Sequence, residues 1–331
     1  MAKADLPKLF RTLAKYGPVV APVRVGENVV FREVTSLEEV ELEYTRSLTP
    51  PKKLFLGPQE EILKFDGEKY EEVFEDGKAV LFGVHACDIN GLLKLDEIYL
   101  DSPQDEYYAR RRENVMIVGM SCVPDERCFC TSTGSSYAYG GFDLFLHDIG
   151  REYVVRVRTE RGYEFTKDGY FKRMEEKDFL AFKKAEEKKV RSIKRKVDLA
   201  GIGDLIDVTP KSLWEELTAK CLACGSCNLV CPTCQCYDVL DVLELDIRSG
   251  SRIRRWDSCM LKRHALVAGG GNFRPTVVER TANRLSCKVG GEIRCVGCGR
   301  CTVYCPAKID LVEMLELSLI HISEPTRLGM I

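Results

Sequence analysis

The chain has 331 residues, 45 % of them hydrophobic and 30 % charged, which is enough for two domains with ordinary globular cores. A net charge of −2 gives no reason to expect nucleic acid or an anionic membrane surface as a partner. No apolar run is long enough to span a bilayer and the N-terminus lacks the apolar core of a signal peptide, so we expect a cytoplasmic protein.

The first part of the chain predicts an α/β domain over residues 1–200. Val19–Val25 and Val29–Val34 flank a Gly26 turn and indicate a hairpin. Ala79–His85 and Val115–Met120 are apolar strand patterns, and a helical pattern begins between them at Asp88, which favours a parallel pair joined by a crossover helix. Further strands are expected at Phe142–Leu146 and Tyr153–Val157.

The stretch from Lys172 to Lys196 is rich in charge and predicts a solvated helix or linker. We expect the Gly201–Asp207 region to mark the boundary with a second domain, residues 208–316. Residues 317–331 show no sustained helical or strand period. We interpret them as a non-native tail that stands in place of the natural C-terminus, and we give His321 no functional weight.

Sixteen cysteines are the outlying feature of the composition, and half of them form two matching motifs. In a reducing cytoplasm, clustered cysteines bind metals more often than they form disulfides. Both motifs have the C-x2-C-x2-C-x3-C-P spacing of bacterial-type ferredoxins. They are Cys221-Leu-Ala-Cys224-Gly-Ser-Cys227-Asn-Leu-Val-Cys231-Pro232 and Cys295-Val-Gly-Cys298-Gly-Arg-Cys301-Thr-Val-Tyr-Cys305-Pro306.

This spacing lets a tight loop direct three thiolates at one [4Fe–4S] cluster, and the fourth cysteine then ligates the other cluster. The predicted ligands are therefore Cys221, Cys224, Cys227 and Cys305 for the first cluster, and Cys295, Cys298, Cys301 and Cys231 for the second. Structural zinc is the alternative. Zinc sites, however, use paired C-x2-C halves with four ligands in all, and two complete runs ending in Cys-Pro are far more specific for iron and sulfur.

The long segment between Pro232 and Cys295 resembles the insert of the α-helical ferredoxin module of succinate dehydrogenase and heterodisulfide reductase subunits. We expect helices at Tyr237–Ile247 and Met260–Ala268. The predicted fold class is α+β, with an N-terminal α/β domain followed by an α-helical dicluster ferredoxin domain.

Eight further cysteines fall into two quartets. The first follows two predicted parallel strands, whose carboxyl ends form ligand crevices, and so indicates a third iron–sulfur site. Four buried free thiols are the alternative. His85 could replace one ligand, but a lone histidine at a strand end is more often a packing residue. For the second quartet a fourth cluster and simple packing are equally consistent with the sequence. The first quartet is Cys87, Cys122, Cys128 and Cys130, and the second is Cys234, Cys236, Cys259 and Cys287.

Several strings resemble those of sulfhydrogenase β subunits, from about Pro18 to Leu315. They are PPKKLFL, FGVHACDINGL, SCVPDERCFC, KCLACGSCNLVCPTCQCYDV, RRWDSC, GGGNFRPT and CVGCGRC. The general layout is also similar to that of the anaerobic sulfite reductase A subunit.

The sulfhydrogenase resemblance implies a subunit of a cytosolic nickel–iron hydrogenase and sulfur reductase. Its neighbours would be a nickel–iron catalytic subunit, a small iron–sulfur subunit and a flavin-containing NAD(P)-reactive subunit. The chain itself would carry electrons through [4Fe–4S] clusters without being catalytic. The alternatives are a relay like the sulfite reductase A subunit, a subunit that reduces polysulfide in its own right, and a zinc-binding interaction module.

Overall fold

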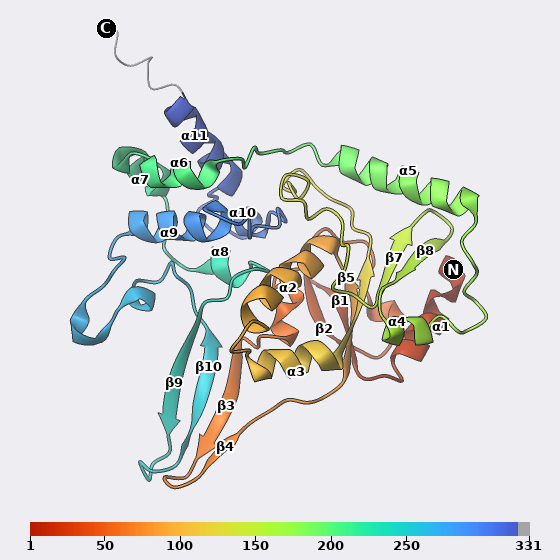
Figure 1. Ribbon diagram of the computed structural model, residues 1–331, viewed down its shortest axis with the longest axis horizontal. Helices are drawn as coiled ribbons and strands as arrows, with labels where there is room; N and C mark the ends of the chain where they lie inside the picture. Colours follow the sequence, from red (N-terminus) through yellow and green to blue (C-terminus); the bar gives the residue numbers. More distant parts are fainter. Residues whose placement is uncertain (324–331) are drawn as a thin grey trace.

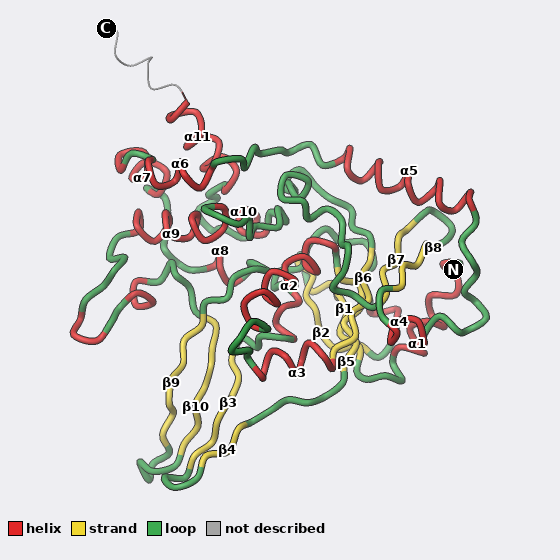
Figure 2. Tube along the Cα trace, viewed as in Figure 1, coloured by secondary structure: helices red, strands yellow, loops and turns green. Residues whose placement is uncertain are grey.

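The computed structural model describes the backbone of residues 1–323 and the side chains of residues 1–203, 206 and 208–317. A six-stranded sheet in the order β2-β1-β5-β6-β7-β8 forms its N-terminal part (Figures 1 and 2). The predicted hairpin is confirmed, and the other predicted strands form with small shifts at their ends. The strands are β1 (Val19–Val25), β2 (Asn28–Val34), β5 (Ala79–Val84), β6 (Val115–Met120), β7 (Leu144–Asp148) and β8 (Tyr153–Val157).

The central strands β1, β5, β6 and β7 run parallel, and β2 and β8 pair antiparallel at the two edges. The expected crossover between β5 and β6 is confirmed and contains α2 (Ala86–Tyr99) and α3 (Glu106–Asn114). Every residue of β6 is buried, as expected for a parallel strand covered on both faces. This arrangement places the residues that follow β5 and β6 at one edge of the sheet.

Helices cover both faces of this sheet. Helix α1 (Leu6–Leu13) buries Leu6, Leu9, Phe10 and Leu13, whose spacing puts them on one helix face against one side of the sheet. Helices α2 and α3 pack on the other side, where they bury a separate apolar cluster. The short helix α4 (Glu160–Glu164) follows β8.

A second sheet of four strands, in the order β4-β3-β10-β9, draws one hairpin from each half of the chain. Figure 1 shows these two hairpins side by side and extending away from the helices. Glu60 on β3 is buried and accepts an ion pair from Arg254 on β10 at 3.2 Å, which ties the two hairpins together. The strands are β3 (Gln59–Phe65), β4 (Tyr70–Glu72), β9 (Tyr237–Leu243) and β10 (Gly250–Trp256).

The expected helix at Tyr237–Ile247 is wrong, because this segment supplies β9 and the turn after it. The β9 strand contains β-branched Val239 and Val242, and all of its residues pair with β10. The Asp246 carboxylate accepts backbone N–H groups of Arg248 and Ser249 at 2.9 Å, which stabilises the hairpin turn. Cross-strand pairing therefore prevails over an apolar pattern that is also compatible with a helix.

The expected helix at Met260–Ala268 is also wrong, because the segment forms a 3₁₀ turn at Lys262–Ala265 and a second 3₁₀ turn begins at Ala268. The preceding residues pack against the first ferredoxin motif, and His264 Nδ1 lies 2.7 Å from Asp257 Oδ2. The helix of this insert is α9 (Val277–Val289), which begins with a capping box formed by Thr276 and Glu279. The dicluster domain thus combines a β-hairpin with helices.

The predicted charged helix is confirmed as α5 (Glu176–Ser192). The region expected to be a boundary forms α6, where fully buried Ile202 packs in one cluster with Val289 and Leu315. The division of the chain near residue 200 stays a prediction. The remaining helices are α6 (Ile202–Val208), α7 (Lys211–Thr218), α8 (Ser226–Leu229), α10 (Arg300–Val303) and α11 (Leu311–Ser323), and 3₁₀ turns occur at Lys3–Asp5, Leu37–Glu39, Pro51–Leu54 and Ala268–Gly270.

Helix α11 continues to Ser323, so the expectation that residues 317–323 lack helical structure is wrong. Leu311, Val312 and Leu315 are buried in one apolar cluster and hold the first turns of this helix, and adding residues to an existing helix costs little. The rest of the expected tail, residues 324–331, lies outside the described residues.

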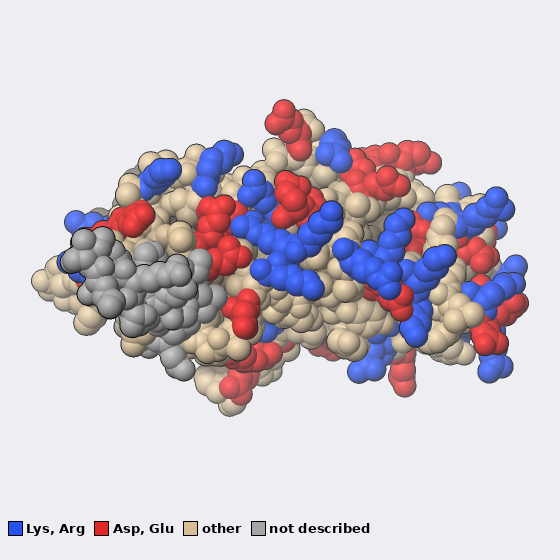
Figure 3. All heavy atoms as spheres, turned by 90° about the horizontal axis from the view of Figure 1, so that it is seen from above, with Lys and Arg blue, Asp and Glu red and all other residues tan. Residues whose placement is uncertain are grey.

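Among the described residues, no helix combines the length and apolar character needed to cross a bilayer. Basic and acidic side chains are interspersed over the face shown in Figure 3. This mixture agrees with the nearly balanced charge of the sequence.

Candidate iron–sulfur centres

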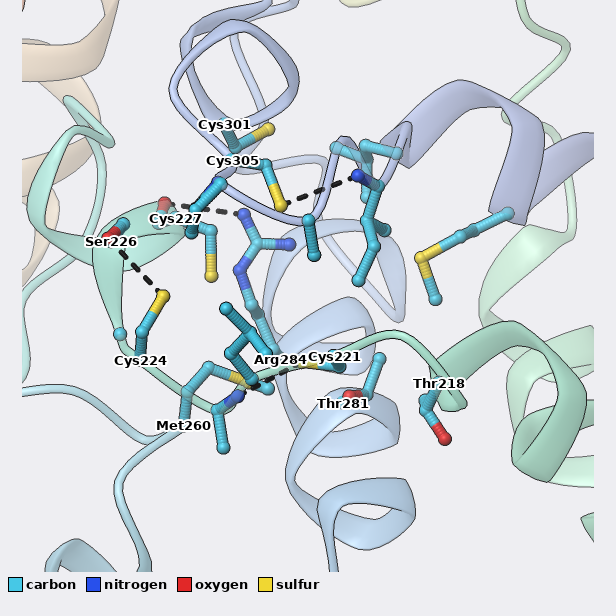
Figure 4. Close-up of a pocket in the computed structure, with 18 of the residues that line it drawn as sticks. Thr218, Cys221, Cys224, Ser226, Cys227, Met260, Thr281, Arg284, Cys301 and Cys305 are labelled. Carbon is cyan, nitrogen blue, oxygen red and sulfur yellow. Dashed lines mark hydrogen bonds between the residues drawn. The ribbon is translucent and has the colours of Figure 1, made fainter.

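Cysteines of both ferredoxin motifs line one pocket, which Figure 4 shows. Cys221, Cys224 and Cys227 come from the first motif, whereas Cys305 enters from the end of the second. Cys301 also borders this pocket. The structure therefore brings together the four cysteines predicted for the first cluster, and their ligation stays a prediction.

The two motif loops have the same backbone design. Gly225 and Gly299 precede α8 and α10 in the left-handed conformation, with φ of 80° and 72°. A Cβ on Gly299 would lie 2.6 Å from the Arg127 carbonyl oxygen, so this loop also needs glycine for close packing.

In both loops, a backbone N–H group donates a hydrogen bond to a cysteine sulfur. The Ala223 N–H donates to Cys221 Sγ at 3.4 Å, and the Gly297 N–H donates to Cys295 Sγ at the same distance. Such bonds stabilise negative charge on a ligating thiolate.

The second predicted set, Cys295, Cys298, Cys301 and Cys231, is partly buried. Burial raises the pKa of Cys295, Cys298 and Cys301, and the charge of Cys231 raises each further. Charges act over several ångström in a site with little water, so Cys231 lies in the surroundings of the other three, and their ligation of one cluster stays a prediction. Because their thiol forms are favoured without metal, iron binding must displace protons from them.

The four cysteines of the N-terminal quartet act on one another electrostatically, and their ligation of a cluster stays a prediction. Cys87 follows β5 at the start of α2, Cys122 follows β6, and Cys128 and Cys130 lie in the next loop. Burial raises the pKa of Cys130 to about 12, and the charges of Cys122 and Cys128 act in the same direction. Burial likewise raises the pKa of Cys87, with contributions from Asp88 and Cys298. This site is therefore close to the second motif as well.

Backbone contacts join the Cys128-Phe-Cys130 loop to the second motif. The Phe129 N–H donates to the Gly297 carbonyl at 2.9 Å. A Cβ on Gly297 would lie only 2.6 Å from Cys130 Cα, so no side chain fits between the loops. Arg46 bridges the same loops, because its Nε donates to the Cys298 carbonyl at 3.0 Å and its Nη2 donates to Cys128 Sγ at 3.3 Å.

Arg300, inside the second motif, is fully buried and binds the N-terminal part of the chain. Its two terminal nitrogens donate to the Asp88 carboxylate at 2.8 Å each, and its Nε donates to the Ser47 carbonyl at 2.8 Å. Arg300 and Asp88 were not among the residues expected from the sequence. The only feature of the sequence that could have indicated them is the charged Arg300 between Cys298 and Cys301 of a metal-binding motif.

His85 stacks on Tyr44 with ring centroids 3.9 Å apart, and its Nδ1 lies 3.2 Å from the Thr45 carbonyl. Its Nε2 is buried without a hydrogen-bond partner among the described residues. Burial, with the charge of Arg300, lowers the pKa of His85 to about 3, so the ring is neutral at physiological pH. A neutral imidazole with an open nitrogen retains the ability to coordinate metal, so packing and the alternative role as a substitute ligand both stay open for His85.

Whether the second quartet shares one centre stays open. Interaction with Cys231 raises the pKa of Cys234, whereas interaction with Cys259 raises the pKa of Cys236, on which the charge of Cys287 also acts. Cys287 is exposed on α9. Interaction with Cys236 lowers the pKa of Cys259.

Among the described residues, no three His, Cys, Asp or Glu side chains lie close enough to hold a single metal ion. A [4Fe–4S] cluster binds each thiolate through a different iron, so its four ligands lie farther apart than those of one ion.

A pair of ferredoxin motifs whose cysteines line one pocket defines an iron–sulfur electron-transfer protein. Residues 220–309 match the family of 4Fe-4S dicluster domains. The chain is 44 % identical over 317 residues to sulfhydrogenase 2 subunit beta of Pyrococcus furiosus, and the match covers 94 % of this chain and 95 % of that protein. The chain thus belongs to the sulfhydrogenase β-subunit family. No solved structure matches it.

Proposed function

We propose that the chain relays single electrons at low potential between a flavin-containing NAD(P)-reactive subunit and a nickel–iron hydrogenase catalytic subunit. The observation that carries this proposal is the continuous packing of three cysteine sets, from the first motif through the second to the N-terminal quartet. The relative at 44 % identity is named as a subunit, which supports the view that this chain is also part of a multi-subunit complex.

Twelve cysteines would hold three [4Fe–4S] clusters, which supply one-electron chemistry at their irons when bound. The ligand sets are Cys221, Cys224, Cys227 and Cys305; Cys295, Cys298, Cys301 and Cys231; and Cys87, Cys122, Cys128 and Cys130.

Buried cations beside these cysteines would tune the relay. Arg284 donates to Asn228 Oδ1 at 2.9 Å and to the Cys227 carbonyl at 3.4 Å. Lys288 donates to Thr233 Oγ1 at 3.0 Å near Cys231. Fixed positive charge in a water-poor site favours an added electron, so both residues would raise the reduction potential of their neighbours.

The packing supports an order for the relay. The N-terminal quartet contacts the second motif through Gly297, Cys298 and Arg46, whereas the first motif shares its pocket with Cys301 and Cys305. The second cluster would therefore lie between the other two. Cys224 of the first motif is exposed, so this end is a candidate contact for a partner subunit.

Iron and acid-labile sulfide analysis of anaerobically purified protein tests the proposal. We expect about twelve irons, from three clusters of about four each, and EPR signals of interacting clusters after reduction. About eight irons would limit the relay to the two ferredoxin-type clusters. A colourless protein that contains zinc and no iron would overturn the proposal.

The identity of the partners needs a separate experiment, because an anaerobic sulfite reductase A-like relay would have similar clusters. Affinity purification of the tagged chain from its native host should recover a nickel-containing subunit. Recovery of a sirohaem subunit would favour the sulfite reductase alternative. Polysulfide reduction by the isolated chain with a chemical electron donor would indicate that the chain is catalytic in its own right.

A further inference from the structure

Two lysines that are almost fully buried bind consecutive residues just beyond the Cys231-Pro232 end of the first motif. Lys52, from the 3₁₀ turn Pro51–Leu54, donates from Nζ to the Cys234 carbonyl at 2.6 Å. Lys288, on α9, donates from Nζ to the Thr233 carbonyl at 3.1 Å and to Thr233 Oγ1 at 3.0 Å. Lys52 is 3 % exposed and Lys288 is 2 % exposed. The same short segment is therefore bound by buried cations from both halves of the chain.

This segment leads directly to a predicted ligand of the second cluster. Thr233 Oγ1, which accepts from Lys288, lies 3.3 Å from Cys231 Sγ. A Cβ on Gly91 of α2 would lie only 2.9 Å from Pro232 Cβ, so α2 packs tightly against the chain at this point. The Cys231 side of the second site is thus covered by protein and bordered by the two lysines.

Neither lysine forms an ion pair with Asp or Glu in the part of the chain that the structure describes. Lys52 Nζ lies 4.6 Å from the centroid of the Trp256 ring, which attracts the cation but carries no net charge. A buried ammonium group is costly when neither water nor an opposite charge stabilises it. The two lysines therefore need a nearby anion that is not a carboxylate.

Other buried cations close to the second motif are already neutralised by carboxylates. Arg300 donates to Asp88 at 2.8 Å. Arg46 donates to Asp125 at 2.6 Å. These pairs add no net charge, whereas the two lysines add net positive charge beside the second site.

We propose that Lys52 and Lys288 raise the reduction potential of the second cluster and make it the cluster on which an electron of the relay comes to rest. Four thiolates give a [4Fe–4S] cluster a net negative charge, which increases when an electron is added. Buried cations stabilise the more negative state most, because little water screens the attraction. The same charge supplies the anion that the two lysines otherwise lack.

This inference rests on the proposed function, because it concerns one cluster of the proposed relay. The two can nevertheless fail separately. Absence of iron from the wild type would overturn the relay and this inference with it, whereas potentials that do not respond to the lysines would leave the relay standing.

The test is a redox titration, followed by EPR, of full-length protein purified anaerobically with its clusters. The signal of the second cluster is identified by its loss in Cys298→Ala, because Cys298 belongs to the second motif whichever motif supplies the fourth ligand. In the wild type, this signal should appear at the highest potential of the clusters. A second cluster that is reduced last would contradict the proposal.

Lys52→Met and Lys288→Met each remove one charge and keep a long apolar side chain. Each should lower the potential of the second cluster, with about a tenfold change in the equilibrium constant for its reduction, which is about 59 mV for one electron. Lys53→Met is the matched control and should leave the potential unchanged, because this neighbouring, partly buried lysine donates to the Phe31 carbonyl instead.

Iron content and circular dichroism of the same samples separate charge from structure. Lys52→Gln and Lys288→Gln retain a hydrogen-bond donor and should show the same lowered potential, even if a methionine variant folds poorly. Wild-type iron with an unmoved potential would mean that the lysines only hold the backbone, and the proposal would be wrong. Loss of the second cluster from all four variants would equally overturn it, because the lysines would then be needed to retain the cluster.

Discussion

Replacement of Arg300 by methionine removes the cation that joins the second cluster loop to α2. Both partners of the Arg300–Asp88 ion pair have side chains that are 1 % exposed. Without Arg300, the Asp88 carboxylate would stay buried and lose two charge-assisted hydrogen bonds, and the Ser47 carbonyl would lose a third. Breaking a buried ion pair from one side costs about 3 to 5 kcal/mol, because the remaining charge is uncompensated.

For a chain of this size, each kcal/mol lowers the melting temperature by about 2 °C, so we expect Arg300→Met to melt roughly 6 to 10 °C below the wild type. The assay is anaerobic thermal denaturation followed by circular dichroism, with iron content measured on the same samples. Arg248→Met, at an exposed position in the β9–β10 turn, is the matched control and should change the melting temperature little.

The double variant Asp88→Leu/Arg300→Met tests the physical reason. Since it removes the uncompensated charge and leaves an apolar pair, it should be more stable than Arg300→Met alone. The reasoning would be refuted if the double variant lost as much stability as the two single variants combined, or if Arg300→Met lost less than about 1 kcal/mol.

Three further predictions follow from the same contacts. Because Cys305 lines the pocket of the first motif, Cys305→Ala should damage the first cluster, and Cys231→Ala should damage the second. EPR that shows each substitution damaging the cluster of its own motif would contradict the cross-ligation. Changing Cys122 and Cys128 together to alanine should remove about four irons and leave the ferredoxin-type clusters intact, and unchanged iron would return the N-terminal quartet to core packing. Burial lowers the pKa of His147, so the folded state binds a proton at this ring less readily than the unfolded state does. The stability that the neutral ring contributes is complete above pH about 6.5 and is lost as the pH falls toward the lowered pKa. His147→Gln should therefore show a shallower loss of melting temperature between pH 7 and 5 than the wild type, and equal slopes would contradict this assignment.

The sequence by itself determined the elements that depend on local patterns. Ferredoxin spacing places three thiolates on one tight loop, so the eight cysteines of the two motifs could be recognised without knowledge of the fold. The buried strands β5 and β6 were equally predictable, because continuous apolar runs between turn residues are typical of parallel strands.

The tertiary structure decided what depends on partners distant in the sequence. The apolar pattern of Tyr237–Leu243 is compatible with a helix, but in the fold this segment pairs with β10. On its other side β10 pairs with β3, which comes from the other half of the chain. Arg300 reaches Asp88 only after both halves of the chain have folded together. Cysteine spacing is a local property and can therefore be recognised in the sequence. The contacts that connect the sites arise instead from packing between segments that no sequence pattern relates.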